Sequence, residues 1–288
     1  MPEPFIAAGA PVLIQGMSGR AGRRHSLAMA AYGTNIVGGV SPRAEEVGGL
    51  PVFATCREAV AATGARASVV IVPPLAVLPA VLEAIDAGIE FIVTLTEGMP
   101  IHDALKAKGA VAEAGIRWIG ASTPGIAIPG KLKLGFLPNA SLSPGNLGVM
   151  AKSGTLSYEV CHRLVSRGLG QSLWVGVGGD PVKGTRFADM LPFFAADEAT
   201  RAVVVMGEIG GDEEEELADR IRSTGFAKPV IALIAGQAAR EGVSMGHAGA
   251  LIQGNVGTAI SKSVALRAAG VEVVERIDDL VEAAAALN

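Results

Sequence analysis

The stretch Val12-Leu13-Ile14-Gln15-Gly16-Met17-Ser18-Gly19-Arg20-Ala21-Gly22 decides the fold class of this chain. It opens with a short apolar run, which predicts a strand, and continues with glycines spaced G-x-x-G-x-x-G. We expect a helix to follow over residues 25–31. A strand, a glycine turn and a helix in this order bind anions, because backbone N–H groups and the helix N-terminus face the ligand. The spacing differs from the G-x-G-x-x-G of dinucleotide-binding proteins, so that match is imperfect.

The residues that follow the next predicted strand, at 36–40, indicate which kind of nucleotide could bind. A dinucleotide site would place Asp or Glu there for the ribose hydroxyl, whereas this strand runs into Ser41-Pro42-Arg43. A cation suits a ribose that carries an extra phosphate, as in NADP or the 3′-phospho-ADP of coenzyme A. Arg43 is equally compatible with a solvated loop, since Glu45 and Glu46 follow it. Both interpretations stay open at this point.

Strands and helices continue to alternate after this point. Thr96 and Glu97 follow a predicted strand over residues 91–95. Because ligands in open parallel sheets bind beyond the carboxyl ends of the strands, these residues should share a rim with Ser18 and Arg20. Further strands are predicted at 68–72 and 117–120, with helices at 55–62, 77–87 and 102–113.

A segment rich in glycine and proline, residues 123–145, interrupts this alternation and predicts a domain boundary. A second series of strands and helices follows, which indicates a second open parallel sheet. The fold class is therefore α/β, with a Rossmann-like domain over residues 1–123 and a second domain over 124–288. In the second domain we predict strands at 148–150, 173–177, 202–206, 230–234 and 271–274, and helices at 156–165, 187–194, 213–221, 256–268 and 279–286.

Composition excludes several classes of protein. Of 288 residues, 38 are glycine, half are hydrophobic and 18% are charged, which is typical of a globular protein with buried parallel strands. The net charge of −4 and the lack of a basic tract with interleaved aromatics argue against nucleic-acid binding. With no long apolar run and no targeting signature, we expect a soluble, cytoplasmic protein without a membrane partner. Cys56 and Cys161 have no metal-ligand spacing, so we predict free thiols and no metal site.

Three strand-to-loop junctions in the second half carry reactive or anion-binding residues. Ser153-Gly154-Thr155 opens a helix, Glu208 lies among glycines, and His247 lies in the run Met245-Gly246-His247-Ala248-Gly249-Ala250. Small neighbours leave the imidazole accessible, and its neutral form is a nucleophile at pH 7. Each junction alone is more often a structural turn. The strand-end rule, however, places all three on one edge of the sheet.

These junctions suggest a division of roles. A nucleophilic histidine needs an acceptor on its other ring nitrogen, and Glu208 is the available carboxylate. A phosphate on His247 would then meet the helix N-terminus at Gly154.

The acidic run Glu213-Glu214-Glu215-Glu216 is interpreted as the first turn of a helix and not as a binding site. Carboxylates in the first turn complement the helix dipole, so we expect this run to be solvated.

Four motifs together resemble the family of succinate–CoA ligase α subunits. The resemblance extends from about Val12 to Ala286, and related acyl-CoA synthetases and ATP-citrate lyase share the motifs. They are Gly246-His247-Ala248-Gly249-Ala250, Gly207-Glu208-Ile209-Gly210-Gly211, Ser153-Gly154-Thr155-Leu156-Ser157-Tyr158-Glu159 and Gly176-Val177-Gly178-Gly179-Asp180-Pro181.

The resemblance implies a CoA-binding Rossmann-like domain followed by a flavodoxin-like ligase domain. It implies an acid–thiol ligase that converts a carboxylic acid, CoA and a nucleoside triphosphate to acyl-CoA, nucleoside diphosphate and phosphate. His247 would carry the phosphoryl group, Glu208 would hold its ring, and Tyr158 would contact a small dicarboxylic acid such as succinate. Ser153, Gly154 and Thr155 would bind phosphate; Ser18, Gly19, Arg20, Ala21, Arg43, Leu95, Thr96 and Glu97 would contact CoA.

The resemblance also implies a partner. An ATP-grasp β subunit would bind ATP or GTP with Mg²⁺, in an αβ or α2β2 heteromer.

The sequence departs from the family pattern at some positions. Examples are Ala21 in place of glutamine and Ser244 in place of a basic residue. These changes fall among the residues expected to contact CoA and at the entry to the site expected to bind the carboxylic acid. Two alternatives are an NADP-dependent oxidoreductase, suggested by the first glycine turn and Arg43, and a non-catalytic CoA-binding protein.

Overall fold

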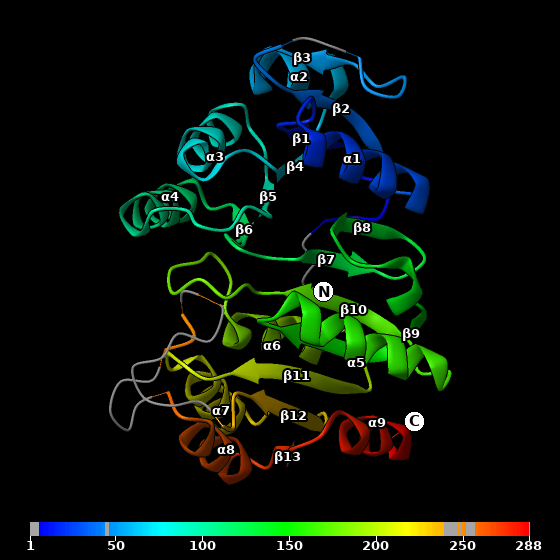
Figure 1. Cartoon of the computed structure of the whole chain (residues 1–288), viewed down its shortest axis with the longest axis vertical. Coiled ribbons are helices and arrows are strands. Elements are labelled where there is room, and N and C mark those ends of the chain that lie inside the picture. Colours follow the sequence, from blue (N-terminus) through cyan, green and yellow to red (C-terminus); the bar gives the residue numbers. More distant parts are fainter. Residues whose placement is uncertain (1–5, 44–45, 239–246, 248, 252–256, 288) are drawn as a thin grey trace. The chain divides into compact units, whose positions relative to one another are not determined.

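The computed structural model describes residues 6–43, 46–238, 247, 249–251 and 257–287. The chain divides into two compact units (Figure 1). The first unit consists of residues 3–136 with 182–185, and the second of residues 137–181 and 186–288 with residues 1–2. Each unit has an α/β fold, as the alternation of strands and helices predicts.

The first unit contains a parallel sheet in the order β3-β2-β1-β4-β5-β6. This is the strand order of a Rossmann fold, whose direction of winding reverses between β1 and β4. Ligands bind beyond the carboxyl ends of the strands at that reversal. The strands are β1 (Val12–Gln15), β2 (Ile36–Val40), β3 (Val52–Phe53), β4 (Ala67–Val70), β5 (Phe91–Thr94) and β6 (Arg117–Ile119).

Capping residues set the ends of several helices in the first unit. Thr55 caps one helix by accepting a hydrogen bond from the Glu58 N–H at 3.2 Å. Gly33 and Gly115 end two others in the left-handed conformation that favours glycine. The elements are α1 (Arg20–Tyr32), α2 (Cys56–Thr63), the short 3-10 helix η1 (Pro74–Ala76), α3 (Val77–Asp86) and α4 (Ile101–Ala114), followed by the antiparallel pair β7 (Gly125–Ile128) and β8 (Leu132–Gly135).

Polar side chains in the core of the first unit are satisfied. Gln15 donates to the carbonyl of Ala80 at 2.8 Å and accepts from Ser68 at 2.8 Å. The fully buried indole of Trp118 donates to Thr94 at 2.9 Å. These bonds let the strands end in polar residues without an unpaired buried group.

The second unit contains the parallel strand order β13-β12-β11-β9-β10. Numbered within the unit this is 2-1-3-4-5, the flavodoxin-like order, with the reversal of winding between β9 and β11. The second domain is therefore flavodoxin-like, as the resemblance implies. The strands are β9 (Pro144–Ala151), β10 (Gln171–Gly176), β11 (Ala202–Glu208), β12 (Val230–Ala235) and β13 (Glu272–Val274).

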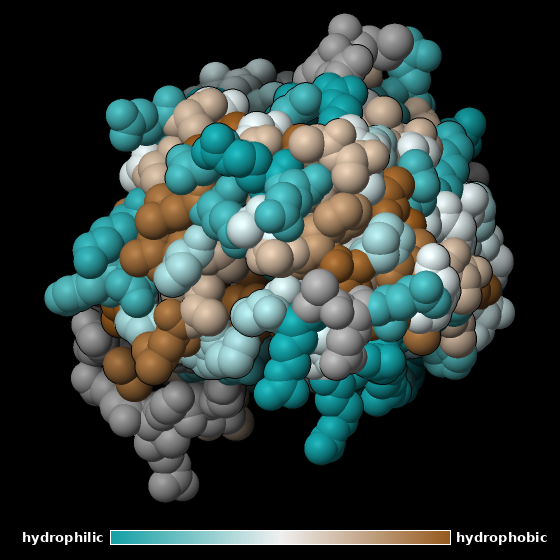
Figure 2. Space-filling model, turned by 90° about the horizontal axis from the view of Figure 1, so that it is seen from above, coloured by the Kyte–Doolittle hydropathy of each residue, from teal (hydrophilic) through white to brown (hydrophobic). Residues whose placement is uncertain are grey.

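The helices of the second unit agree with the predicted ones apart from their ends. They are α5 (Gly154–Ser166), α6 (Phe187–Ala196), α7 (Glu213–Thr224), α8 (Ala259–Ala268) and α9 (Ile277–Ala286), with the 3-10 helix η2 (Asn139–Ser141) before β9. No helix within the described ranges is long and apolar enough to cross a membrane. On the face drawn in Figure 2, hydrophobic areas are interspersed with hydrophilic side chains.

Candidate active site

His247 and Glu208 form a direct pair in the second unit. The Nδ1 atom of His247 lies 2.9 Å from Oε1 and 2.8 Å from Oε2 of Glu208, which is the last residue of β11. The Glu208 side chain is 11% exposed and that of His247 is 27% exposed. Since a carboxylate only accepts hydrogen bonds, Nδ1 carries the proton and Nε2 carries the lone pair of the neutral ring. The arrangement therefore selects the tautomer in which Nε2 is unprotonated.

Gly179 packs directly against the imidazole. A Cβ atom built on Gly179 would lie 2.6 Å from Cγ of His247 and 2.9 Å from Nδ1, far inside normal contact distance. Its carbonyl also accepts a hydrogen bond from the Gly249 N–H at 3.2 Å. The loop after β10 thus forms one wall of the histidine site. In the sequence Gly179 stands out only as part of a glycine-rich motif, and no local pattern indicates that its missing side chain makes room for the ring.

Ser153 caps helix α5 at the carboxyl end of β9. Its Oγ accepts from the Leu156 N–H at 3.4 Å, so the hydroxyl serves the helix itself in this structure. Gly154 is half-buried and Thr155 is exposed. The first turn of α5 carries no acidic residue, so its N-terminal N–H groups provide a positive end that suits an anion.

Tyr158 lies one turn further along α5. Its ring is half-buried and packs against Trp174, with the ring centroids 6.4 Å apart. Burial raises the pKa of its hydroxyl to about 12, so the group stays protonated at neutral pH and can donate a hydrogen bond to a carboxylate.

The acidic run at the start of α7 does not behave as predicted. Glu214 is fully buried and Glu213 is 4% exposed, whereas Glu215 is half-buried and Glu216 is exposed. The prediction of a solvated turn is therefore wrong for the first two residues. The reason is tertiary, because two buried lysines reach these carboxylates from other elements. Lys152 lies 3.8 Å from Glu213 and 2.9 Å from Glu214, and Lys262 is ion-paired with Glu214.

The residues expected to bind CoA lie at the carboxyl ends of β1, β2 and β5 in the first unit. Helix α1 begins at Arg20, five residues earlier than predicted, with Gly19 as N-cap and no acidic residue in the first turn. Gly16 has φ of +84°, and a Cβ there would lie 2.3 Å from the carbonyl oxygen of Ile71. Glycine is therefore required where the chain turns after β1 against the backbone of Ile71. The turn leads into α1, whose N-terminus suits an anion.

The residues expected to bind CoA differ in how exposed their side chains are and in whether those side chains are already hydrogen-bonded. Arg20, Ala21 and Arg43 are exposed, and so is Glu97. Thr96 donates to the carbonyl of Val72 at 2.7 Å, which ties the loop after β5 to the end of β4. The hydroxyls of Ser18 and Ser41 are hydrogen-bonded to each other. Leu95 is 4% exposed, so it offers a ligand little surface.

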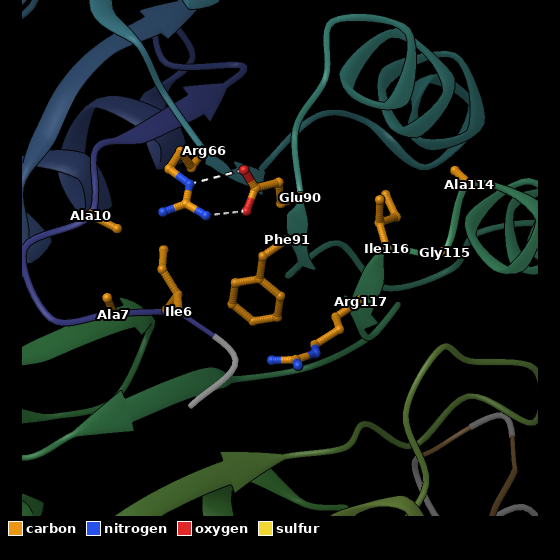
Figure 3. Close-up of a pocket in the computed structure, with 10 residues that line it drawn as sticks. All are labelled: Ile6, Ala7, Ala10, Arg66, Glu90, Phe91, Ala114, Gly115, Ile116 and Arg117. Atoms are coloured by element: carbon orange, nitrogen blue, oxygen red, sulfur yellow. Dashed lines mark hydrogen bonds and ion pairs between the residues drawn. The ribbon is translucent and has the colours of Figure 1, made fainter. Parts of the chain in front are cut away.

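A cavity of about 380 Å³ lies at the opposite, amino ends of β5 and β6 (Figure 3). Its polar rim includes the exposed ion pair of Arg66 and Glu90, in which Nε of Arg66 donates to the carboxylate at 2.9 Å. None of the predicted site residues lines this cavity, and parallel sheets bind ligands at the other edge. We therefore assign it no role. In the part of the chain that the structure describes, no cluster of three or more His, Cys, Asp or Glu side chains could hold a metal ion.

Comparison with known families places this chain of two α/β units among the CoA-ligases. A family model described as "CoA binding domain" matches residues 9–98, and one described as "CoA-ligase" matches residues 150–272. Two α subunits of ADP-forming succinate–CoA ligases from Archaeoglobus fulgidus are 45% and 49% identical over 94% and 91% of this chain, and over 93% and 91% of their own length. The Aquifex aeolicus subunit is 44% identical over 92% of this chain and 88% of its own. The chain belongs to the family of succinate–CoA ligase α subunits.

Solved structures show the same fold in larger proteins. ATP citrate lyase from Methanosaeta concilii superposes with a TM-score of 0.88 at 23% identity, over 98% of this chain and 50% of the lyase chain. An acetyl-coenzyme A synthetase from Ca. Korarchaeum cryptofilum gives a TM-score of 0.77 at 23% identity, over 96% and 60%. This chain thus spans half to three-fifths of those chains, and at this identity the likeness concerns the fold alone.

Proposed function

We propose that this chain is the catalytic α subunit of an ADP-forming acid–CoA ligase and that His247 carries the phosphoryl group. The observation that carries the proposal is the pairing of Nδ1 of His247 with the Glu208 carboxylate at 2.8–2.9 Å. This pairing makes Nε2 the nucleophile without a separate base. Family membership supports the reaction class, because the relatives are named as succinate–CoA ligase α subunits.

The proposed chemistry has three steps that balance. Nε2 of His247 attacks the γ-phosphorus of a nucleoside triphosphate, and the diphosphate leaves. The acid's carboxylate oxygen then attacks the phosphorus, which forms an acyl phosphate and frees the imidazole. The thiol of CoA finally attacks the acyl carbon, so that a thioester forms. Inorganic phosphate leaves with the C–O bond electrons and takes up the thiol proton. The Glu208 carboxylate stabilises the positive charge that the ring acquires in the first step.

We assign anion binding to the first turn of α5. Ser153, Gly154 and Thr155 supply backbone N–H groups at a helix N-terminus, where negative charge is stabilised by about 0.3–1 kcal/mol when exposed and about 2 kcal/mol when partly buried. The protonated hydroxyl of Tyr158 on the same helix suits the acid's second carboxylate. Succinate is the acid we propose, since it is named for the relatives.

CoA binding is assigned to the first unit. The open N-terminus of α1 and the exposed cations Arg20 and Arg43 lie at the carboxyl edge of its sheet, and they match the diphosphate and the 3′-phosphate of CoA in charge. Ser18, Gly19, Ala21, Leu95, Thr96 and Glu97 complete this rim. Under this proposal residues 1–123 bind CoA, and phosphoryl transfer belongs to the part of residues 124–288 that forms the second unit.

The name of the relatives as α subunits implies a β subunit as partner. We propose that this partner is an ATP-grasp chain that binds the nucleotide with Mg²⁺, in an αβ or α2β2 assembly. Mg²⁺ would supply charge neutralisation on the transferred phosphate. To phosphoryl transfer this chain would contribute the nucleophile His247, the Glu208 carboxylate that fixes its tautomer, and the helix N-terminus that binds the phosphate.

Labelling of the native assembly tests the proposal. The α chain, purified with its partner, should acquire acid-labile, base-stable label from ATP labelled in the γ-phosphate, and peptide mapping should place the label on His247. Addition of succinate and CoA should discharge it. His247→Asn should remove the label while the assembly remains intact. Label that persists in His247→Asn, or a wild-type chain that takes up no label and shows no thioester formation, would refute the proposal.

A further inference from the structure

A buried charge cluster lies directly behind the histidine site, and we propose that Lys152 and Glu214 are positioning residues for phosphoryl transfer. In this role they hold the Glu208 end of β11 and the Ser153 end of β9 in fixed relation. The inference rests on the proposed function of His247 and deepens it, since it concerns how the nucleophile's partner is kept in place.

Glu214 is bound to the backbone of Glu208. Its Oε1 accepts a hydrogen bond from the Glu208 N–H at 3.1 Å, although the two residues belong to β11 and to α7. The contact is close enough to exclude a side chain at the preceding position. A Cβ on Gly207 would lie 2.6 Å from Oε1 of Glu214. Any shift of the Glu214 carboxylate therefore acts on the residue that orients the imidazole.

Lys152 connects the same carboxylate to the anion-binding turn. Its Nζ lies 2.9 Å from Oε1 and donates to Oε2 of Glu214 at 3.0 Å, and its own backbone N–H donates to Met206 at 3.1 Å. It immediately precedes Ser153, the N-cap of α5. One buried side chain thus ties the carboxyl ends of β9 and β11 together at the point where the winding of the sheet reverses.

Lys262 holds Glu214 from the far side. This fully buried residue of α8 is ion-paired with Glu214, lies 3.0 Å from Glu215 and donates to the Gly211 carbonyl at 2.9 Å. Burial raises the pKa of Glu214, but the two lysines more than offset this, so its pKa lies below the ordinary value. Glu214 is therefore ionised at neutral pH, and both of its oxygens are held.

The burial of this cluster argues for a role beyond stability. Replacing a buried ion pair by apolar residues of similar size is often neutral or stabilising, whereas removing one partner is strongly destabilising. A pair retained for stability alone could be replaced by apolar residues without loss of activity. A pair that anchors the Glu208 backbone could not be, because an apolar side chain does not accept its N–H bond.

Two variants of the native assembly separate these possibilities. The double variant Lys152→Met with Glu214→Leu removes both members of the pair, and Lys262 keeps Glu215 as a partner. Glu213, which lies 3.8 Å from Lys152, keeps the hydrogen bond from the Phe187 N–H at 2.9 Å. Lys152→Arg keeps the cation. The matched control is Arg163→Met, which removes exposed ion pairs from the same helix α5 at its distant end.

The double variant should fold, assemble and keep the wild-type KM for CoA, while the single-turnover rate of His247 labelling falls by about 10²-fold, the usual effect of a misplacement of about 1 Å at a reacting centre. Lys152→Arg should recover most of that rate, and the control should match wild type. A double variant that labels at the control rate overturns the inference. If it fails to fold, the comparison is made between Lys152→Arg and Lys152→Met, in which Glu214 keeps Lys262 as a partner. Only Lys152→Met should be slow, and equal rates for the two variants overturn the inference. Absence of label in the wild type would instead overturn the proposed function.

Discussion

Replacing Gly179 by alanine should slow the phosphorylation of His247 by about 10²-fold in a chain that remains folded. The backbone itself accepts the change, because Gly179 is not among the glycines with positive φ. The obstacle is the imidazole. The added Cβ would lie 2.6 Å from Cγ of His247, 2.9 Å from Nδ1 and 3.0 Å from Cβ.

The size of the effect follows from these distances. Non-bonded carbon atoms rest at about 3.5–4.0 Å, so the ring has to move by about 1 Å. Such a movement away from Gly179 disturbs the Nδ1 contacts with Glu208, which now measure 2.8 and 2.9 Å and are lost beyond about 3.5 Å. A misplacement of about 1 Å costs about 10²-fold in rate, which corresponds to about 2.7 kcal/mol of activation free energy.

The assay is the single-turnover rate of His247 labelling by γ-phosphate-labelled ATP, measured beside the thermal midpoint of unfolding. Gly109→Ala is the matched control, because a Cβ at this position in α4 meets nothing within 4 Å. It should leave labelling unchanged and stabilise the chain by about 0.5–1 kcal/mol, as alanine does in a helix. A Gly179→Ala chain that labels as fast as Gly109→Ala would show that the glycine does not shape the histidine site.

Three further outcomes are expected. Arg43→Ala should raise the KM for CoA about tenfold or more, which is the effect of losing one charge-assisted hydrogen bond. The KM for dephospho-CoA should change less, and His247 labelling should not change. Equal increases in KM for both thiols would argue against a contact between Arg43 and the 3′-phosphate. Thr55→Ala should lower the free energy of unfolding by about 1 kcal/mol without changing turnover, since it removes the N-cap of α2; an unchanged denaturation midpoint would contradict this. Burial raises the pKa of Cys56 and Cys161 from 9.0 to about 12, so both thiols stay protonated in the folded chain but ionise first in the unfolded one. Stability should therefore fall as pH rises from about 9 towards 12, and both thiols should resist alkylation at neutral pH until denaturant is added; rapid alkylation of the native chain would contradict their burial.

Several features of the site follow from local patterns. Short apolar runs predict β1, β5, β9 and β11, and with them the rim positions of Ser18, Thr96, Ser153 and Glu208. Parallel strands end at one edge, so a one-dimensional pattern is enough to bring such residues to that edge. The early start of α1 was missed, because the glycines before residue 25 weaken the helical signal although Gly22 lies inside the helix.

The sequence by itself thus determined the α/β class, the two successive series of strands and helices, and the residues that follow each strand. Tertiary structure decided the order of the strands in the two sheets, the close approach of Gly179 to His247 and the burial of Glu213 and Glu214. The physical reason is the range of each effect. Hydrophobic periodicity and capping act between neighbours in the chain. The burial of the ionised Glu214 side chain, in contrast, depends on Lys152 and Lys262, which are 62 and 48 residues away in sequence.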